Sequence, residues 1–272
     1  MTLSGGVIRE GDPLVILVVE GWKRRKYYVK PRRGASYATF AGVLRGSEII
    51  GKPWGYSGRL GRSNYYLLPP VGPELVEEFG VRRSQVIYSK DSAFIAYKAG
   101  VRPGSRVFEA GVGSGFLTIA IATMLCPTGM VYGVEKRRDM LEAARSNIEA
   151  SGFSECVSLR LGDIRNGVGV EGLDAGFLDM PDPWEALDAS YKALKPGAVL
   201  AVFIPTVNQL ARLIEETRKH GGFVVYEVGE VLYREWEPVE GAVRPSPRMT
   251  GHTGFIAFLR RLYALENAPD NG

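Results

Sequence analysis

The sequence predicts an α/β fold in which a doubly wound, mostly parallel sheet follows a small β-rich domain. After residue 102, apolar runs of strand length alternate regularly with segments of helical character, which is typical of parallel sheets covered by helices. Before residue 70, short β-like runs are separated by glycines, and the proline-rich stretch 69–73 divides the two patterns. We therefore expect a small domain over 1–70 and a larger domain over 71–272.

The small domain is expected to be barrel-like, because its β-like runs are short and separated by turn residues. These runs are 13–20, 26–29, 38–41 and 65–68. After the proline-rich stretch we expect a short helix over 74–79. Asp91 is then expected to cap a helix that ends at Lys98.

The large domain is expected to hold parallel strands with helices between them. The strands are 106–110, 130–135, 157–163, 174–179 and 198–204, and the helices are 116–125, 137–150, 184–194 and 207–220. The runs 223–237 and 254–262 have no helix between them and fit a final antiparallel pair. In such sheets, ligands bind outside the carboxyl ends of the strands.

Composition is that of an ordinary globular protein, with 45% hydrophobic and 24% charged residues. No apolar run reaches the roughly 18 residues of a membrane span, and the first residues do not resemble a signal peptide, so we expect a cytoplasmic protein. Cys126 and Cys156 are expected to be separate buried thiols, although a bond between subunits stays open. No cluster of Cys, His and acids has metal-ligand spacing, so we expect no metal.

Positive charge is concentrated near the amino terminus. Residues 21–66 contain eleven bases and one acid, Glu48, which gives +10, and the net charge of +4 leaves −6 for the remainder. Aromatic residues are interleaved with the bases, a pattern typical of nucleic-acid binding. The alternative is a solvated charged face over an aromatic core. The candidate contacts with a phosphate backbone are Arg24, Arg25, Arg32 and Arg33.

A glycine-rich turn joins the strand 106–110 to the helix 116–125. Glycine lets the backbone N–H groups of such a turn approach a ligand closely. A dinucleotide fingerprint needs a third glycine at position 116, where this chain has Phe116. The observed order is Glu-x-Gly-x-Gly-x-Gly over 109–115, so a nicotinamide dehydrogenase is the weakest of the functions we consider.

Acids end the strands that surround this turn. Glu135 follows the glycine turn by about twenty residues, where a carboxylate can accept both ribose hydroxyls of an adenosine cofactor. Asp163 and Asp179 end the next two strands. The structural alternatives are a first-turn acid for Glu135 and a helix N-cap for Asp163.

The turn over 109–115 resembles the first motif of the class I S-adenosylmethionine methyltransferases. The stretch Asp179-Met-Pro-Asp-Pro-Trp184 is similar to the end of the fourth strand in members that act on exocyclic amines. With the segments 61–70, 82–91 and 247–254, the chain resembles the tRNA (adenine-N1)-methyltransferases that act at position 58. The departure is Ser89, where many members have proline.

The resemblance implies a Rossmann-like methyltransferase domain, S-adenosylmethionine as cofactor, tRNA as partner and a homotetramer. It implies methyl transfer to N1 of adenosine 58, and archaeal members also act at 57. The implied catalytic residues are Asp179, which faces the N6 amine, and Tyr88, which is a wall or a hydrogen-bond donor for the flipped base; the alternative for Tyr88 is an ordinary core tyrosine. The implied substrate contacts are Trp184, Arg248 and His252. The implied cofactor-binding residues are Glu109, Gly111, Gly113, Ser114, Gly115, Phe116, Leu117, Glu135, Asp163, Ile164 and Asp179.

Two alternatives remain at this stage. A small-molecule methyltransferase of the same fold, such as a precorrin enzyme, has no use for the +10 segment. A non-catalytic tRNA-binding subunit keeps that segment but has a vestigial cofactor pocket. The intact acids Glu135, Asp163 and Asp179 favour the catalytic form.

Overall fold

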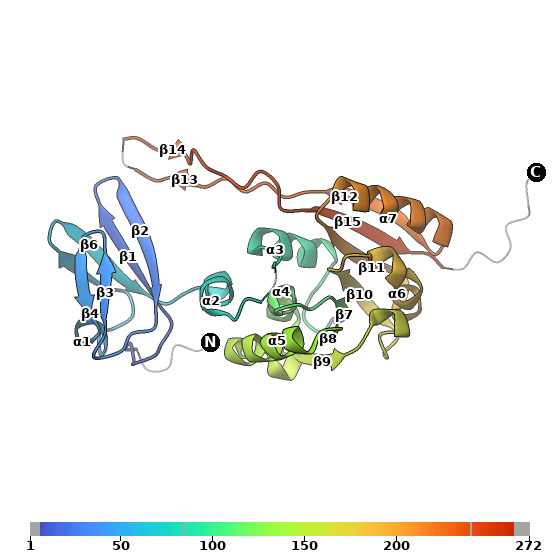
Figure 1. The fold of residues 1–272 in the computed structure, drawn as a ribbon, viewed down its shortest axis with the longest axis horizontal. Coiled ribbons are helices and arrows are strands. Elements are labelled where there is room, and N and C mark those ends of the chain that lie inside the picture. Colours follow the sequence, from blue (N-terminus) through green and yellow to red (C-terminus); the bar gives the residue numbers. More distant parts are fainter. Residues whose placement is uncertain (1–5, 84, 240, 264–272) are drawn as a thin grey trace, which may run out of the picture. The chain divides into compact units, whose positions relative to one another are not determined.

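The computed structural model describes residues 6–83, 85–239 and 241–263. The chain divides into two compact units. The first comprises Met1–Gly80 and Arg234–Met249, and the second comprises Val81–Tyr233 and Thr250–Gly272. Figure 1 shows the elements of each unit, coloured along the sequence.

The first unit is β-rich. Its four-stranded antiparallel sheet has the order β2-β1-β6-β5, and β3 pairs with β4 in a separate hairpin. One core, which includes Leu14, Ile16 and Leu67, is shared by both. The elements are β1 (Leu14–Glu20), β2 (Lys23–Val29), β3 (Ser36–Thr39), β4 (Gly42–Arg45), α1 (Gly46–Ile49), β5 (Tyr56–Leu60), β6 (Ser63–Leu68), α2 (Gly72–Phe79), β13 (Trp236–Glu237) and β14 (Arg244–Pro245).

Three features of this unit differ from the prediction. The expected strand 38–41 is divided: residues 38 and 39 end β3, and residues 40 and 41 form the hairpin turn before β4 begins at Gly42. Strand β5 was not expected, since Ser57, Gly58 and Arg59 have low strand propensity. Its place is set by packing: a Cβ at Gly58 would collide with the ring of Tyr65. Among the described strands β2 and β5 do not pair, so the sheet is open and not a closed barrel.

The second unit is a seven-stranded sheet in the order β12-β15-β11-β10-β7-β8-β9. β15 runs antiparallel to both its neighbours, and the pairs from β11 to β9 are parallel. The elements are α3 (Ser89–Lys98), β7 (Arg106–Ala110), α4 (Phe116–Leu125), β8 (Met130–Glu135), α5 (Arg138–Ser151), η1 (Ser154–Cys156), β9 (Val157–Leu161), η2 (Ile164–Asn166), β10 (Leu173–Leu178), η3 (Pro183–Ala186), α6 (Leu187–Ala193), β11 (Leu194–Ile204), α7 (Val207–His220), β12 (Phe223–Gly229) and β15 (Phe255–Arg261).

The two faces of this sheet bury separate cores. On one face Val107 and Phe177 pack with Ile95 of α3 and Ile121 of α4. On the other, residues of α6 and α7 pack against neighbouring sheet positions, among them Phe108. Neighbouring strand residues point to opposite faces, so the near-continuous apolar strands serve both cores. The predicted α/β class, with a doubly wound sheet and a small β-rich region, is confirmed.

Several boundaries differ from the prediction. Asp91 is not the cap of α3: Tyr88 is, and Asp91 lies fully buried in the first turn. The strand expected over 157–163 ends at Leu161. The helix expected over 184–194 begins with the 3₁₀ turn η3, and the strand expected over 223–237 ends at Gly229.

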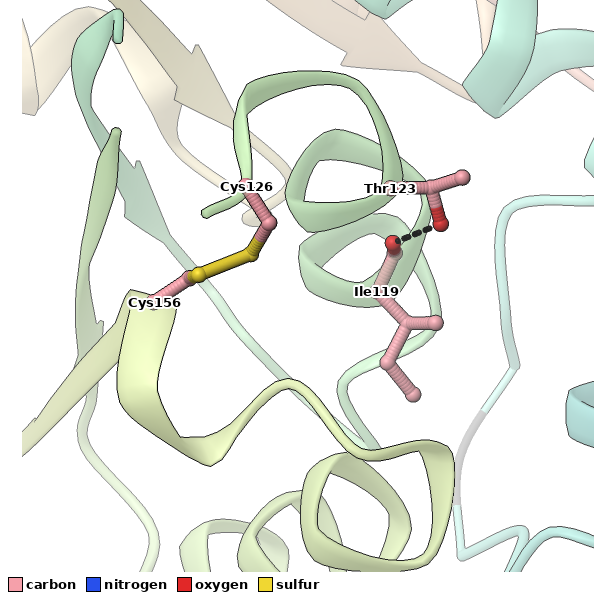
Figure 2. Close-up of a disulfide and its surroundings, with 4 residues drawn as sticks. All are labelled: Ile119, Thr123, Cys126 and Cys156. Carbon is pink, nitrogen blue, oxygen red and sulfur yellow. Dashed lines mark hydrogen bonds between the residues drawn. A yellow bond between two sulfur atoms is a disulfide. The ribbon is translucent and has the colours of Figure 1, made fainter. Parts of the chain in front are cut away.

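The expectation of two separate thiols is also wrong. Cys126, which follows α4, is disulfide-bonded to Cys156 of η1, with 5.9 Å between the Cα atoms. Figure 2 shows this bond beside α4, where the hydroxyl of Thr123 donates to the carbonyl of Ile119. The bond links the end of α4, which follows β7, to the residue just before β9. β8, the strand that lies between β7 and β9 in the sheet, is thus spanned by the bond.

None of the helices in the described part of the chain has the length and apolar character needed to span a bilayer.

Candidate functional site

A cavity of about 700 Å³ opens at the carboxyl ends of the central parallel strands of the second unit. Glu109 and Ala110 of β7, Glu135 of β8 and Asp179 after β10 all line it. The chain leaves β7 toward β8 and returns to its other side at β10, so the strand order reverses between β7 and β10. Ligands of open α/β sheets bind at this reversal point, and the cavity lies in a size range that suits small ligands.

The glycine turn lies against the end of β10. Gly111 has a φ of +83°, and a Cβ there would overlap the carbonyl oxygen of Asp179. The Asp179 N–H donates to the carbonyl of Ala110 at 2.9 Å. Only glycine therefore allows both the left-handed backbone and this close approach.

Most of the predicted turn residues line the cavity, namely Gly111, Gly113, Ser114, Phe116 and Leu117. Gly115 does not: it is the N-cap of α4, where its φ of +83° sets the helix start. The hydroxyl of Ser114 is also engaged, since it accepts from the Arg83 N–H at 3.1 Å.

Glu135 holds the glycine turn in place. Its buried carboxylate accepts the Gly113 N–H at 2.8 Å through one oxygen and the Arg137 N–H at 2.9 Å through the other. Each carboxylate oxygen has a second lone-pair direction, so Glu135 keeps acceptor capacity toward the cavity it lines.

Glu109 and Asp179 form an acidic pair on this cavity. Burial raises the pKa of Glu109 to about 8, against the hydrogen bond from Thr118, with a further rise from the charges of Asp179 and Glu135. Burial, with a smaller effect of the Glu135 charge, raises the pKa of Asp179 to about 7. Strongly raised carboxyl pKa values in a cleft are typical of functional sites. The site therefore favours a ligand that brings positive charge or hydrogen-bond donors.

Asp163 lies on the same cavity but already has a partner. It is the N-cap of η2, and its carboxylate pairs with the guanidinium of Arg165, which lowers the pKa of Asp163 far below its usual range. Arg165 also reaches Glu185 at 2.9 Å. Sequence reasoning missed Arg165, although its spacing two residues beyond the acid was visible. The buried Ile164 lines the cavity beside it.

The predicted aromatic walls lie off the cavity. Tyr88 caps α3 and is 37% exposed, with the Arg82 guanidinium 6.0 Å from its ring. Its neighbour Ile87 lines the cavity, but Tyr88 is not among the lining residues. Trp184 packs against the core under the Arg212 guanidinium, 4.1 Å from its ring, while Pro181 and Asp182 of the same turn line the cavity.

His252 is held by its own unit. One ring nitrogen lies 2.9 Å from Glu230 and the other 3.1 Å from the Pro205 carbonyl. The hydrogen bond to Glu230 raises the pKa of His252. Arg248 belongs to the first unit and is exposed. The structure thus assembles the predicted cofactor residues but does not bring the predicted substrate residues onto the cavity.

A buried network that was not predicted supports the cavity wall. The Lys90 ammonium donates to both Asp91 oxygens, to the Val231 carbonyl and to Thr253. The Thr253 hydroxyl donates to Asp91 at 2.8 Å, and Thr253 lines the cavity. The sequence signal for this network is the adjacent pair Lys90 and Asp91. Of the two, only Asp91 is assigned a role by the sequence pattern, that of a helix cap.

No group of three or more Cys, His, Asp or Glu residues with a geometry that holds a metal occurs among the described residues.

The comparisons agree with this architecture. The chain is 31% identical over 249 residues to the tRNA (adenine(58)-N(1))-methyltransferase TrmI of Thermus thermophilus, covering 90% of this chain and 96% of that one. It is 30% identical over 222 residues to the tRNA (adenine(57)-N(1)/adenine(58)-N(1))-methyltransferase TrmI of Methanocaldococcus jannaschii, covering 72% and 78%. The structure of a SAM-dependent O-methyltransferase from Thermotoga maritima is similar, with a TM-score of 0.86, 30% identity and coverage of 96% and 97%.

The model of the family described as tRNA methyltransferase complex GCD14 subunit matches residues 64–245. The match includes the glycine turn, all six acids that line the cavity and the stretch 179–184. The chain belongs to this tRNA methyltransferase family.

Proposed function

We propose that the protein transfers the methyl group of S-adenosylmethionine to N1 of adenosine 58 in the T loop of tRNA. The observation that carries the proposal is Asp179, a carboxyl group of raised pKa on the cavity at the point where the strand order reverses. Family membership and the names of two relatives, one matched over nine tenths of this chain, support the reaction.

The cavity residues fit the cofactor. Glu135 keeps acceptor capacity for ribose hydroxyls, and the backbone N–H of Ile164, which lines the cavity, is the candidate donor to the adenine. Asp163 accepts the adenine amine only if it shares or exchanges its contact with Arg165. The cofactor supplies an electrophilic methyl group on a sulfonium, and that positive charge suits a cavity with Glu109 and Asp179 on its wall.

Asp179 has the chemistry that the acceptor base requires. Positive charge develops on adenine as N1 is methylated, and a carboxylate at the exocyclic N6 amine stabilises it. Displacement at the methyl group requires alignment of the reacting atoms, so positioning contributes much of the rate. The Asp179 N–H bond to Ala110 and the contact with Gly111 fix the backbone of this carboxylate.

The candidate substrate residues follow from the resemblance to the family and from the surroundings of each side chain in the structure. Tyr88, Arg248 and His252 remain candidates for contact with the flipped nucleotide. Trp184 supports the 181–183 turn from the core. The basic segment of the first unit, including Arg24, Arg25, Arg32 and Arg33, holds the tRNA phosphates. We assign tRNA binding to the domain expected over 1–70 and methyl transfer to the domain expected over 71–272, although 71–80 and 234–249 fall in the first compact unit. We further propose that the protein is cytoplasmic and that it forms a homotetramer. Light scattering of the purified protein tests the tetramer.

Methylation of adenosine 57 as well is a second candidate, favoured by the name of the Methanocaldococcus relative. Nucleoside mass spectrometry of treated tRNA, with the modified position mapped, tests both proposals. Product at 58 alone supports the first, and product at both positions the second. A methylated hydroxyl group would instead agree with the name of the Thermotoga structure and overturn both.

Replacement of Asp179 by Ala or Asn is expected to reduce turnover about 10²–10³-fold, the usual cost of one preorganised contact to developing charge. Cofactor affinity should change little. Single-turnover methyl transfer to tRNA measures the effect, with Asp188→Ala on α6 as the control because Asp188 is an exposed acid that does not line the cavity. Near-normal turnover of the Asp179 variants would contradict the proposed role.

Glu135→Ala and Asp163→Ala are expected to weaken S-adenosylmethionine binding at least about tenfold, because each removes charge-assisted hydrogen bonds worth about 1.5–3 kcal/mol. Titration calorimetry measures the affinity. Glu142→Ala removes an exposed acid of α5 and serves as the matched control. Unchanged affinity in both site variants would refute the cofactor pocket described above.

Cofactor binding should stabilise the protein more at high pH. The pKa of Asp179 is raised from 3.8 to about 7 and that of Glu109 from 4.5 to about 8. Their contribution to stability is full below the unfolded values of 3.8 and 4.5 and falls as pH rises until it is lost above about 7 and 8, because between these values the folded protein binds protons that the unfolded chain has released. A cationic ligand offsets this loss.

Thermal melting with S-adenosylmethionine at pH 5.5 and 8.5 tests this expectation. The gain in Tm should be larger at pH 8.5. S-adenosylhomocysteine lacks the sulfonium charge and should show a smaller pH dependence, as should the Asp179→Asn variant. Equal gains for the two ligands at both pH values would show that the cavity carboxyls do not respond to the charge.

Replacement of Arg24, Arg25, Arg32 and Arg33 by Ser should weaken tRNA binding and lower its salt dependence, because fewer counterions are released. All four side chains are exposed, and none forms an ion pair with another described residue. Arg145→Ser on α5 and Arg218→Ser on α7 are exposed controls. An unaltered salt slope in the fourfold variant would assign the segment another role.

A further inference from the structure

Trp22 projects from the tip of the first hairpin. Glu20 pairs with Lys23, so Gly21 and Trp22 form a two-residue turn between β1 and β2, at the end of the blue hairpin in Figure 1. Gly21 has a φ of +54°, whereas no described residue other than glycine has a positive φ. This is the pattern of a type II′ turn, which fixes the hairpin tip tightly. The Trp22 side chain is 70% exposed.

A second hairpin tip lies beside the first. β1 and β6 are antiparallel, with Val19 opposite Asn64, so the turn after β1 and the turn before β6 lie at the same end of the sheet. Gly61, with a φ of +62°, and Arg62 form that second turn. The Ser63 hydroxyl donates to the Glu20 carboxylate at 2.7 Å and links the two tips. Trp22 and Arg62 therefore hold equivalent turn positions on neighbouring hairpins.

A third turn completes this end of the unit. Phe40 and Ala41 connect β3 to β4, and the Lys23 ammonium lies 4.3 Å from the centroid of the Phe40 ring. The Phe40 N–H donates to the Tyr27 hydroxyl at 2.8 Å, which anchors the third turn to β2. We call this end of the first unit the tip surface, made of Trp22, Lys23, Arg24, Phe40 and Arg62.

The tip surface combines an exposed indole with unneutralised bases. Lys23, Arg24 and Arg62 are exposed and form no ion pair with a described residue, in contrast to Lys26, which pairs with Glu74 at 2.7 Å. A single exposed apolar side chain is ordinary on a protein surface. Here, however, the second central position of a type II′ turn has no need of an aromatic residue, and Trp22 lies at the same end of the sheet as Lys23, Arg24 and Arg62, whose charges attract a polyanion.

We propose that Trp22 stacks on an unpaired base of the bound tRNA while Lys23, Arg24 and Arg62 contact the adjoining phosphates. Indole rings stack on any base through its π face, and bases of this kind are available only in single-stranded or loop nucleotides. The fixed turn reduces the ordering that stacking requires. This inference rests on the proposed function and adds a base-stacking contact to the phosphate contacts of the basic segment.

The test compares tRNA affinity of Trp22→Ala, Trp22→Phe and Arg62→Ser over a range of salt concentrations. Loss of one stacked base should weaken binding about 5- to 100-fold with an unchanged salt slope, because stacking releases no phosphate counterions. Trp22→Phe should retain most of the affinity. Arg62→Ser should lower the slope by about one unit at most. Tyr97→Ala, which removes a 77%-exposed aromatic residue of α3, is the matched control.

Fluorescence separates stacking from a structural effect. A single-stranded oligonucleotide should quench the emission of the wild-type protein more than that of Trp22→Phe. Melting temperature and S-adenosylmethionine affinity should be equal in all variants, since the cofactor cavity is lined by the second unit.

Wild-type affinity for tRNA in Trp22→Ala, or a changed salt slope, overturns this inference. If the wild-type protein meanwhile methylates tRNA, the proposed function stands. Binding to anionic vesicles that depends on Trp22, with tRNA affinity unaffected, would assign the tip surface to a membrane and also overturn the inference.

Discussion

The close approach of β7 and β10 at their carboxyl ends determines the rest of the site. A backbone hydrogen bond joins Ala110 to Asp179, and Gly111 turns away from the sheet directly against the Asp179 carbonyl. The glycine turn can therefore reach Glu135, which accepts the Gly113 N–H and so joins the turn to β8. One close contact thus places ligand-facing groups from three strands around a common cavity, and no side chain larger than hydrogen is compatible with it.

This arrangement brings acids together at an electrostatic cost. Burial raises the pKa of both Glu109 and Asp179; the Glu135 charge adds to the rise of both, and the Asp179 charge adds to that of Glu109. Asp163 differs because Arg165 and Lys136 lie beside it, 3.6 Å away in the case of Lys136. The same residue type thus has opposite pKa shifts within one cavity. The deep carboxyls gain most from a donor-rich or cationic ligand, whereas Asp163 requires the ligand to compete with an existing ion pair.

Local patterns predicted the second unit well. The predicted bounds of β7, α4, β8 and α7 coincide with the observed ones, because each has a clear apolar period and a turn or cap at its ends. Features that depend on contacts distant in sequence were missed. β5 is held by the fit of Gly58 to Tyr65, Asp91 is buried by Lys90 and Thr253, and the disulfide requires that α4 and η1 end side by side. Neither local propensity nor sequence spacing shows which distant residues lie close together. For the same reason the sequence did not show that Trp184 packs against the core and not on the cavity.

The structure gives a physical reason for the uneven distribution of charge along the chain. Arg165 shows what a base does beside the cavity: it occupies the carboxylate that a ligand would use. A protein that binds a polyanion with many bases must keep most of them away from acids that bind a second ligand. The eleven bases of residues 21–66 belong to the first unit, and the cavity acids belong to the second. Division into two folded units therefore lets each set of charges serve its own ligand: phosphates for the bases of the first unit, and a cationic or donor-rich ligand for the cavity acids of the second.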